Sequence, residues 1–257
     1  MTLSKKLILS FVAVLTVALP LRADKLTVAA ASNLVYALDT LNAVFHQVAP
    51  DIEVTTLTGA SGSLFAQITH GAPIDVFLSA DTDYPQKLVK AGAADAATLT
   101  TFATGRLALW TTKPGLDVSD VATTLADPRV QHIAIANPKT APYGRAARQT
   151  LDALKLSDAV ASRLVLGENI AQTAQFVETG NAEVGFVALT FVLAPLNKNK
   201  GTYSEVPQNL YTPLDQGAVI TKHGSANPAA KRYLEFLNSS AAREVLQRFG
   251  YGLPDTK

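Results

Sequence analysis

The chain of 257 residues contains no cysteine, so no disulfide can form even in an oxidising compartment. Its formal net charge is only +1 and it has no basic tract, which argues against a nucleic-acid partner. It also lacks a phosphate-binding loop and the glycine fingerprint of dinucleotide-binding proteins. Beyond the N-terminus, no apolar run is long enough to cross a bilayer.

Residues 1–23 have the pattern of a cleavable signal peptide. Lys5 and Lys6 form a charged segment, and the apolar run 7–20 follows it. This run is shorter than the roughly 20 residues that a membrane-spanning helix needs, so cleavage is favoured over an uncleaved anchor. We predict a mature protein that begins near Asp24 and is soluble in the periplasm. Its roughly 230 residues can form one large domain or two lobes.

Short apolar runs alternate with helical patterns along the mature chain. Several of these runs are continuous and β-branched, as in strands that are covered on both faces. Such alternation predicts an α/β fold with parallel sheets and right-handed crossovers. The predicted strands are residues 26–30, 52–58, 75–80, 107–111, 133–136, 164–166, 184–187 and 217–220.

The order of these elements predicts two α/β lobes. A chain that leaves the first lobe near residue 104 and returns near residue 210 would connect the lobes by two crossings. The first lobe would then contain residues 24–104 and 210–257, and the second would contain residues 105–209. Two amphipathic helices, 227–237 and 240–249, complete the first lobe.

Hydroxyl and amide side chains stand where two predicted strands give way to helices. Ser32 and Asn33 follow the first strand, and Ser61 follows the second within Gly-Ala-Ser-Gly-Ser. Ser and Asn are preferred N-cap residues, and a helix N-terminus carries free N–H groups and a partial positive charge. Two such junctions at neighbouring strand ends predict a concave anion site that needs no lysine or arginine.

Two further junctions repeat this pattern in the second half of the chain. Residues 137–144 lead from a strand to a helix, with Pro142 suited to the first turn and Tyr143 after it. Residues 167–170 do the same and place Ile170 at another helix start. Each junction alone is a weak signal, because capping residues begin most helices whatever their function. Four of them on two lobes together favour one site for a small dianion.

Groups suited to catalysis are scarce by comparison. Ser61 lacks the final glycine of a nucleophile elbow and has no obvious His–Asp partner. Asp81 and Asp83 could form a metal pair, but Asp-x-Asp after a strand is more often a cap plus a solvated charge. The histidines show no metal-ligand spacing and are expected at the surface: His46, His70, His132 and His223.

Several of these segments resemble the periplasmic molybdate-binding proteins, the substrate-receiving components of molybdate ABC transporters. The run Val-Ala-Ala-Ala-Ser-Asn-Leu at 28–34 resembles their first ligand loop. Segment 71–81, Gly-Ala-Pro-Ile-Asp-Val-Phe-Leu-Ser-Ala-Asp, is the most specific match. The resemblance covers essentially the whole mature chain and includes segments 59–64, 137–144 and 249–251.

This resemblance implies a type II periplasmic binding protein fold, which is α/β and has two lobes and a hinge of two segments. It implies a tetrahedral oxyanion, molybdate or tungstate, held between the lobes by hydroxyl and backbone N–H donors. The contacts would be made to the oxyanion and not to a bare metal cation, and no other cofactor is expected. The implied ligand residues are Ser32, Asn33, Ser61, Tyr143 and Ile170.

One position departs from the family pattern. Other members carry a tyrosine just after the strand at 184–187, where this chain has Ala188. We hypothesise that Tyr143 supplies the missing phenol. The resemblance further implies that a monomeric protein without enzymatic activity delivers the anion to the membrane permease of an ABC transporter.

Three other functions remain open at the level of the sequence. A receptor of the same fold could bind another oxyanion, such as sulfate, chromate or a phosphonate. A secreted hydrolase could use Ser61 as its nucleophile. The effector lobe of a transcription regulator shares this architecture, but it would need DNA-reading helices where the signal segment stands.

Overall fold

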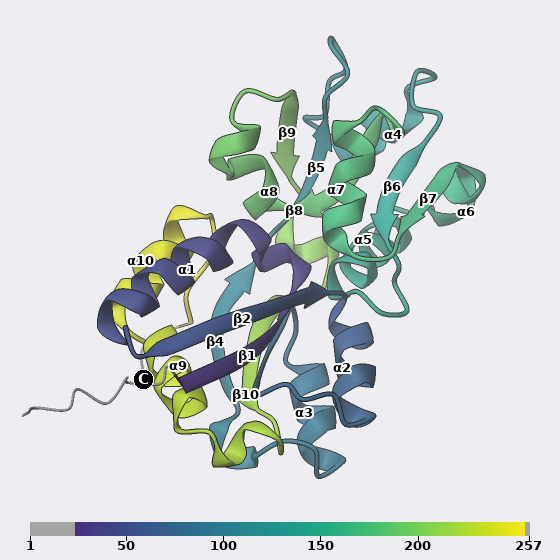
Figure 1. The fold of residues 1–257 in the computed structure, drawn as a ribbon. Coiled ribbons are helices and arrows are strands. Elements are labelled where there is room, and N and C mark those ends of the chain that lie inside the picture. Colours follow the sequence, from purple (N-terminus) through teal and green to yellow (C-terminus); the bar gives the residue numbers. More distant parts are fainter. Residues whose placement is uncertain (1–23, 255–257) are drawn as a thin grey trace, which may run out of the picture.

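The computed structural model describes residues 24–254 and shows two lobes, each built on one five-stranded sheet with flanking helices (Figure 1). The two α/β lobes agree with the fold class predicted from the sequence. The predicted signal peptide at residues 1–23 lies outside the described residues. Within residues 24–254, no helix combines the length and the apolar character that crossing a membrane requires.

The first lobe is a sheet with helices on both faces. Its strands are β1 (Asp24–Ala31), β2 (Ile52–Gly59), β3 (Val76–Ser79), β4 (Thr100–Gly105) and β10 (Leu214–Ile220), in the order β2-β1-β3-β10-β4. Its helices are α1 (Val35–Val48), α2 (Ser61–Thr69), α3 (Asp83–Lys90), α9 (Pro228–Leu237) and α10 (Ser240–Arg248). Successive residues of β1 face opposite sides of the sheet, so Val28 packs with α1, α9 and α10, whereas Ala29 packs with α2 and α3.

The second lobe has the same plan. Its strands are β5 (Leu107–Thr111), β6 (Ile133–Ala136), β7 (Leu164–Gly167), β8 (Val184–Ala188) and β9 (Thr202–Glu205), in the order β7-β6-β8-β5-β9. Its helices are α4 (Val121–Ala126), α5 (Pro142–Ala153), α6 (Ser157–Val160), α7 (Ile170–Glu178) and α8 (Leu189–Leu193). One buried cluster connects sheet and helices, from Trp110 on β5 to Leu151 on α5 and Val177 on α7.

All eight predicted strands are present, but the prediction of parallel sheets is wrong for β10 and β5. β10 runs antiparallel to β3 and β4, and β5 runs antiparallel to β8 and β9. The path of the chain through the hinge, the two segments that join the lobes, explains the antiparallel course of β10. The chain leaves the first lobe through β4, crosses at Arg106 and returns through residues 206–213 into β10. Leu214 pairs with Gly105, so the outgoing and returning segments lie side by side in opposite directions.

Phe45 on α1 provides a test of the first-lobe core. Its side chain is 1% exposed, and its ring packs edge-on against that of Tyr233 with the centroids 4.9 Å apart. Phe45→Ala should lower the free energy of unfolding by about 3–5 kcal/mol, because burial is lost and a cavity remains. Val48→Ala on the same helix, at 63% exposure, should change it by less than about 0.5 kcal/mol. Urea unfolding measures both, and equal losses would contradict this description of the core.

Candidate anion-binding site

A small cavity between the lobes brings together all five residues that the sequence predicts as anion ligands. It measures about 10 Å³, near the smallest volume that holds one water molecule. Ser32, Asn33 and Ser61 line it from the first lobe, and Tyr143 and Ile170 line it from the second. Among the described residues, the rest of the lining is uncharged: Ala31, Gly59, Ala60, Ala80, Ala141 and Pro142.

The two serines do not cap their helices, which corrects one expectation from the sequence. The N-cap residues are Ala31, before the short 3-10 helix η1 (Ser32–Leu34), and Ala60, before α2, and neither helix has a side-chain cap. The reason is that β1 and β2 stay paired up to their last residues, so each helix begins only at the serine. Ser32 and Ser61 are therefore first-turn residues whose hydroxyls remain available to another partner.

Two helix starts on the second lobe face the same cavity. α5 begins at Pro142 without a side-chain cap. α7 is capped by Asn169, whose Oδ1 accepts hydrogen bonds from the N–H groups of Ala171 and Gln172 at 2.9 and 3.1 Å. This cap uses the second and third N–H groups of the helix. It leaves the first one, on Ile170, for another partner.

The hydroxyl of Ser61 is prepared to donate. Ser61 is 1% exposed, and its Oγ accepts a hydrogen bond of 3.0 Å from the N–H of Ala80. Because the oxygen is already an acceptor for this N–H, the hydroxyl hydrogen can point at a ligand. The next residue, Gly62, donates its N–H to the carbonyl of Thr140 on the other lobe at 2.8 Å. The helix start at Ser61 is thus held against the second lobe.

The side chain of Asn33 is already occupied, although the residue lines the cavity. Its Nδ2 donates to Oε1 of Gln216 and to the hydroxyl of Tyr251, both at 2.8 Å. An amide nitrogen has only two hydrogens, so none remains for an anion. Its Oδ1 has no hydrogen-bond partner among the described residues, and as an acceptor it cannot bind an anion. Only the backbone N–H of Asn33 can therefore serve as an anion donor.

The phenol of Tyr143 is buried near the hinge. The side chain is 1% exposed, and within residues 24–254 its hydroxyl has no hydrogen-bond partner. Burial raises the pKa of this phenol well above its usual value of 10.0, so the group stays protonated and able to donate at neutral and mildly alkaline pH. The hydroxyl rests against Gly105, where a Cβ atom would lie only 2.1 Å from the oxygen. Glycine at this position makes room for the phenol.

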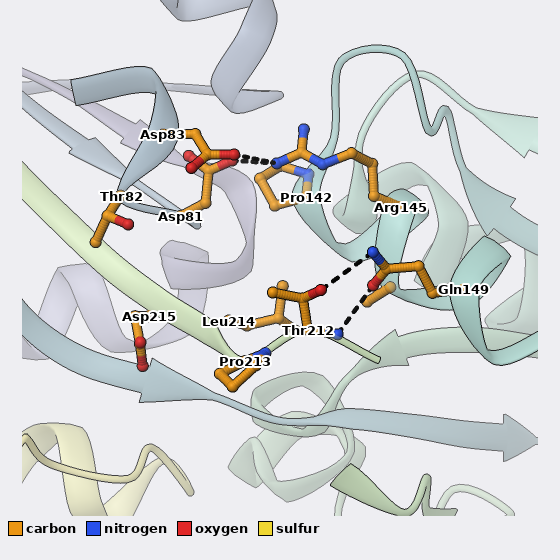
Figure 2. Close-up of a pocket in the computed structure, with 11 residues that line it drawn as sticks. Asp81, Thr82, Asp83, Pro142, Arg145, Gln149, Thr212, Pro213, Leu214 and Asp215 are labelled. Carbon is orange, nitrogen blue, oxygen red and sulfur yellow. Dashed lines mark hydrogen bonds and ion pairs between the residues drawn. The ribbon is translucent and has the colours of Figure 1, made fainter. Parts of the chain in front are cut away.

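A second, larger cavity of about 250 Å³ adjoins the first and contains the charged groups (Figure 2). Arg145 on α5 forms an ion pair with Asp81 and lies 3.8 Å from Asp83, so it bridges the lobes. Asp81 also accepts a hydrogen bond of 3.1 Å from the N–H of Tyr84 in the first turn of α3. Asp81 thus accepts from the first turn of α3 as a capping side chain would, although the N-cap residue is Thr82, and Asp83 is the solvated charge of the pair.

Two residues that make these contacts, Gln216 and Arg145, were not predicted from the sequence. Gln216 falls one residue before the predicted strand 217–220, so its place inside the sheet was not recognised. Arg145 stands in the first turn of a helix, where a positive charge opposes the dipole, and this could have indicated a pairing with a carboxylate. The histidines are all exposed, as expected: His46, His70, His132 and His223. Among the described residues, no group of three or more histidine, aspartate or glutamate side chains is placed to hold a metal ion.

Comparisons with known proteins identify the family and the fold. The family model described as bacterial extracellular solute-binding protein matches residues 26–252. The molybdate-binding protein ModA of Azotobacter vinelandii is 47% identical over 201 residues, covering 78% of this chain and 79% of that protein. ModA of Rhodobacter capsulatus is 40% identical over 238 residues, covering 93% of this chain and 92% of that protein.

A solved structure extends the likeness to three dimensions. The periplasmic molybdate-binding protein of Azotobacter vinelandii matches with a TM-score of 0.85 and 36% sequence identity, covering 90% of this chain and 100% of that one. The resemblance inferred from the ligand loops is thereby confirmed. The chain belongs to the family of bacterial extracellular solute-binding proteins, and the ModA proteins are among its relatives.

Proposed function

We propose that the chain binds molybdate between its two lobes and delivers it to the permease of an ABC transporter. The observation that carries this proposal is the convergence of four helix starts, two from each lobe, on one uncharged cavity. The ModA relatives, which are named for molybdate, support the choice of anion. Tungstate shares the shape and charge of molybdate, so the same donors should accept both.

The donor set explains how a dianion can be held without a positive side chain. Removing an anion from water is prohibitive unless hydrogen bonds replace its hydration shell. Hydrogen bonds to a charged group contribute about 1.5–3 kcal/mol each, and helix N-termini add a favourable field. The hydroxyls of Ser32 and Ser61 and the N–H groups of Asn33, Tyr143 and Ile170 supply the donors. Because these groups donate, they favour an oxyanion without a proton over monoprotonated phosphate.

Entry of the anion should require the lobes to separate. A cavity of about 10 Å³ has room for about one water molecule, whereas a tetrahedral oxyanion has five heavy atoms. The donors are divided between the lobes, so an anion favours the arrangement that unites them. The hydrogen bond from Gly62 to Thr140 and the ion pair of Arg145 with Asp81 join the lobes in the tightly closed arrangement of the structure, so these contacts must loosen before an anion can enter.

The setting of this activity is also part of the proposal. Residues 1–23 direct export, and the protein acts in the periplasm as a monomer without a further cofactor or a nucleic-acid partner. It is a binding protein rather than an enzyme. In support, Ser61 Oγ is hydrogen bonded to the N–H of Ala80, which cannot act as the base that a serine nucleophile would need.

A panel of anions tests the proposed function directly. Bound anion stabilises the folded state by mass action, by about 2.7 kcal/mol at one hundred times the dissociation constant. Molybdate and tungstate should raise the melting temperature most, and phosphate should have little effect. Thermal shift and calorimetry with molybdate, tungstate, sulfate, chromate, phosphate and a phosphonate give the ranking. If sulfate, chromate or the phosphonate leads it, the molybdate assignment is wrong and that anion is the ligand.

Ser61→Ala tests the hydroxyl donors. Loss of one hydrogen bond to a charged ligand should weaken molybdate binding by about 1.5–3 kcal/mol, roughly 10- to 150-fold. Ser63→Ala, on the exposed side of the same helix, is the matched control and should leave the affinity unchanged. Isothermal titration calorimetry measures both variants. Equal affinities for the two would remove Ser61 from the ligand set.

Tyr143→Phe tests whether this phenol replaces the tyrosine that relatives carry at the position of Ala188. The two sites are close, because Ala188 pairs with Leu107, two residues beyond the Gly105 against which the hydroxyl rests. The variant should bind molybdate about tenfold more weakly, while its fold is retained because the hydroxyl has no partner among the described residues. Tyr203→Phe, at an exposed tyrosine of the same lobe, is the control. An unchanged dissociation constant for Tyr143→Phe would show that this phenol does not contact the anion and would contradict the hypothesis.

A further inference from the structure

The C-terminal segment returns to the anion site. This gives a role to the motif Phe-Gly-Tyr at residues 249–251, which the proposed function leaves unused. Gly252 exchanges two backbone hydrogen bonds of 2.8 Å with Thr104, next to the first hinge crossing. This anchor places the preceding residue, Tyr251, inside the lobe at 3% exposure. Its hydroxyl accepts from Nδ2 of Asn33 at 2.8 Å and donates to the carbonyl of Asn33 at 3.0 Å. One phenol therefore holds Asn33 at two points.

Gln216 holds the same residue from the hinge strand β10. Gln216 is fully buried, and its Oε1 accepts from Nδ2 of Asn33 at 2.8 Å. Its Nε2 donates to the carbonyls of Ala80 and Leu214 at 3.2 and 2.7 Å. The pairing of β10 with β4 shifts register between Gln216 and Gly217, and such an irregularity re-aims a side chain. A single amide thus connects two loops of the site with the strand that returns from the other lobe.

The other lobe reaches Asn33 as well. The hydroxyl of Thr190 in α8 donates to the carbonyl of Asn33 at 2.9 Å. This carbonyl therefore accepts hydrogen bonds from Tyr251 and Thr190, while both side-chain donors of Asn33 are engaged by Tyr251 and Gln216. With its carbonyl and its amide both fixed, Asn33 cannot turn, and the edge of the residue that lines the cavity keeps its position.

We propose that Gln216 and Tyr251 are positioning residues of the anion site. They touch no ligand themselves; they hold Asn33 so that its backbone N–H is already directed at the cavity when an anion arrives. This inference rests on the proposed function, since it assigns the two residues to the same anion site. Donors that are fixed in advance lose less entropy on binding, so their loss should appear as lower affinity.

Three variants separate positioning from a contribution to stability alone. Tyr251→Phe removes only the hydroxyl, and Gln216→Met keeps the side-chain length but removes all three hydrogen bonds. Tyr233→Phe is the matched control: Tyr233 is equally buried, and its hydroxyl donates to Oδ1 of Asn42 at 2.8 Å, a residue that does not line the cavity. Each of the three loses at least one hydrogen bond made by a buried side chain, so all three should melt at a lower temperature than the wild type without ligand.

Only the first two variants should also lose affinity for molybdate. We expect the dissociation constant to be about tenfold higher for Tyr251→Phe and about 10- to 100-fold higher for Gln216→Met. Tyr233→Phe should stay within about twofold of the wild type. Calorimetry gives the constants, and amide hydrogen exchange at residues 32–34 without ligand should be faster in the first two variants only. Because Tyr251→Phe keeps the buried ring, it folds and serves as the test even where Gln216→Met does not.

The outcomes distinguish this inference from the proposed function. If the wild type binds molybdate and Tyr251→Phe binds it equally well, with exchange like that of Tyr233→Phe, the positioning role is overturned and the proposed function stands. If the wild type binds no anion of the panel, the proposed function fails and the positioning of an anion donor fails with it.

Discussion

Holding a doubly charged anion away from water, without a cation beside it, requires hydrogen-bond donors that are fixed before the anion arrives. In the proposed binding mode the first turns of helices supply these donors. Three of the four helices at the cavity begin without a side-chain cap, and the cap on α7 spares the N–H of Ile170. A missing cap costs a helix about 1 kcal/mol. Local helix stability is therefore given up at the place where the anion can substitute for the cap.

The charged side chains lie beside the small cavity and not in its lining. Arg145 adjoins the cavity, yet its guanidinium is committed to Asp81 and Asp83 of the other lobe and lies over the ring of Tyr84, 5.6 Å from the centroid. The arginine compensates the carboxylate nearest the site, which would otherwise repel an anion. The same contact joins the lobes. The ion pair of Arg145 with Asp81 thus neutralises a carboxylate and also joins the two lobes, while the donors that line the cavity are uncharged.

Much of this arrangement could be predicted from the sequence, and the failures have definite causes. The apolar runs identified eight strands, and the family resemblance of the loops implied five residues that all line one cavity. β4 and β9 were missed because they are threonine-rich or polar, as in Thr-Tyr-Ser-Glu, and carry no apolar run. The antiparallel course of β10 depends on a partner more than one hundred residues away, which local periodicity cannot reveal. The side-chain amide of Asn33 is hydrogen bonded to Gln216 and Tyr251, which are also more than one hundred residues away in the chain.

The pairing of β4 with β10 governs how the two lobes can move. The two segments that join the lobes leave the first sheet as a hydrogen-bonded ribbon, with Leu214 opposite Gly105. Sliding one segment along the other would break this ladder, whereas twisting or bending the ribbon as a unit preserves it. The two segments that join the lobes are therefore tied together where they leave the first sheet, which favours a rotation of the lobes about this ribbon over a sliding of one past the other. Such a rotation would bring the same serines and helix starts back to the same relative positions at each closure of the lobes.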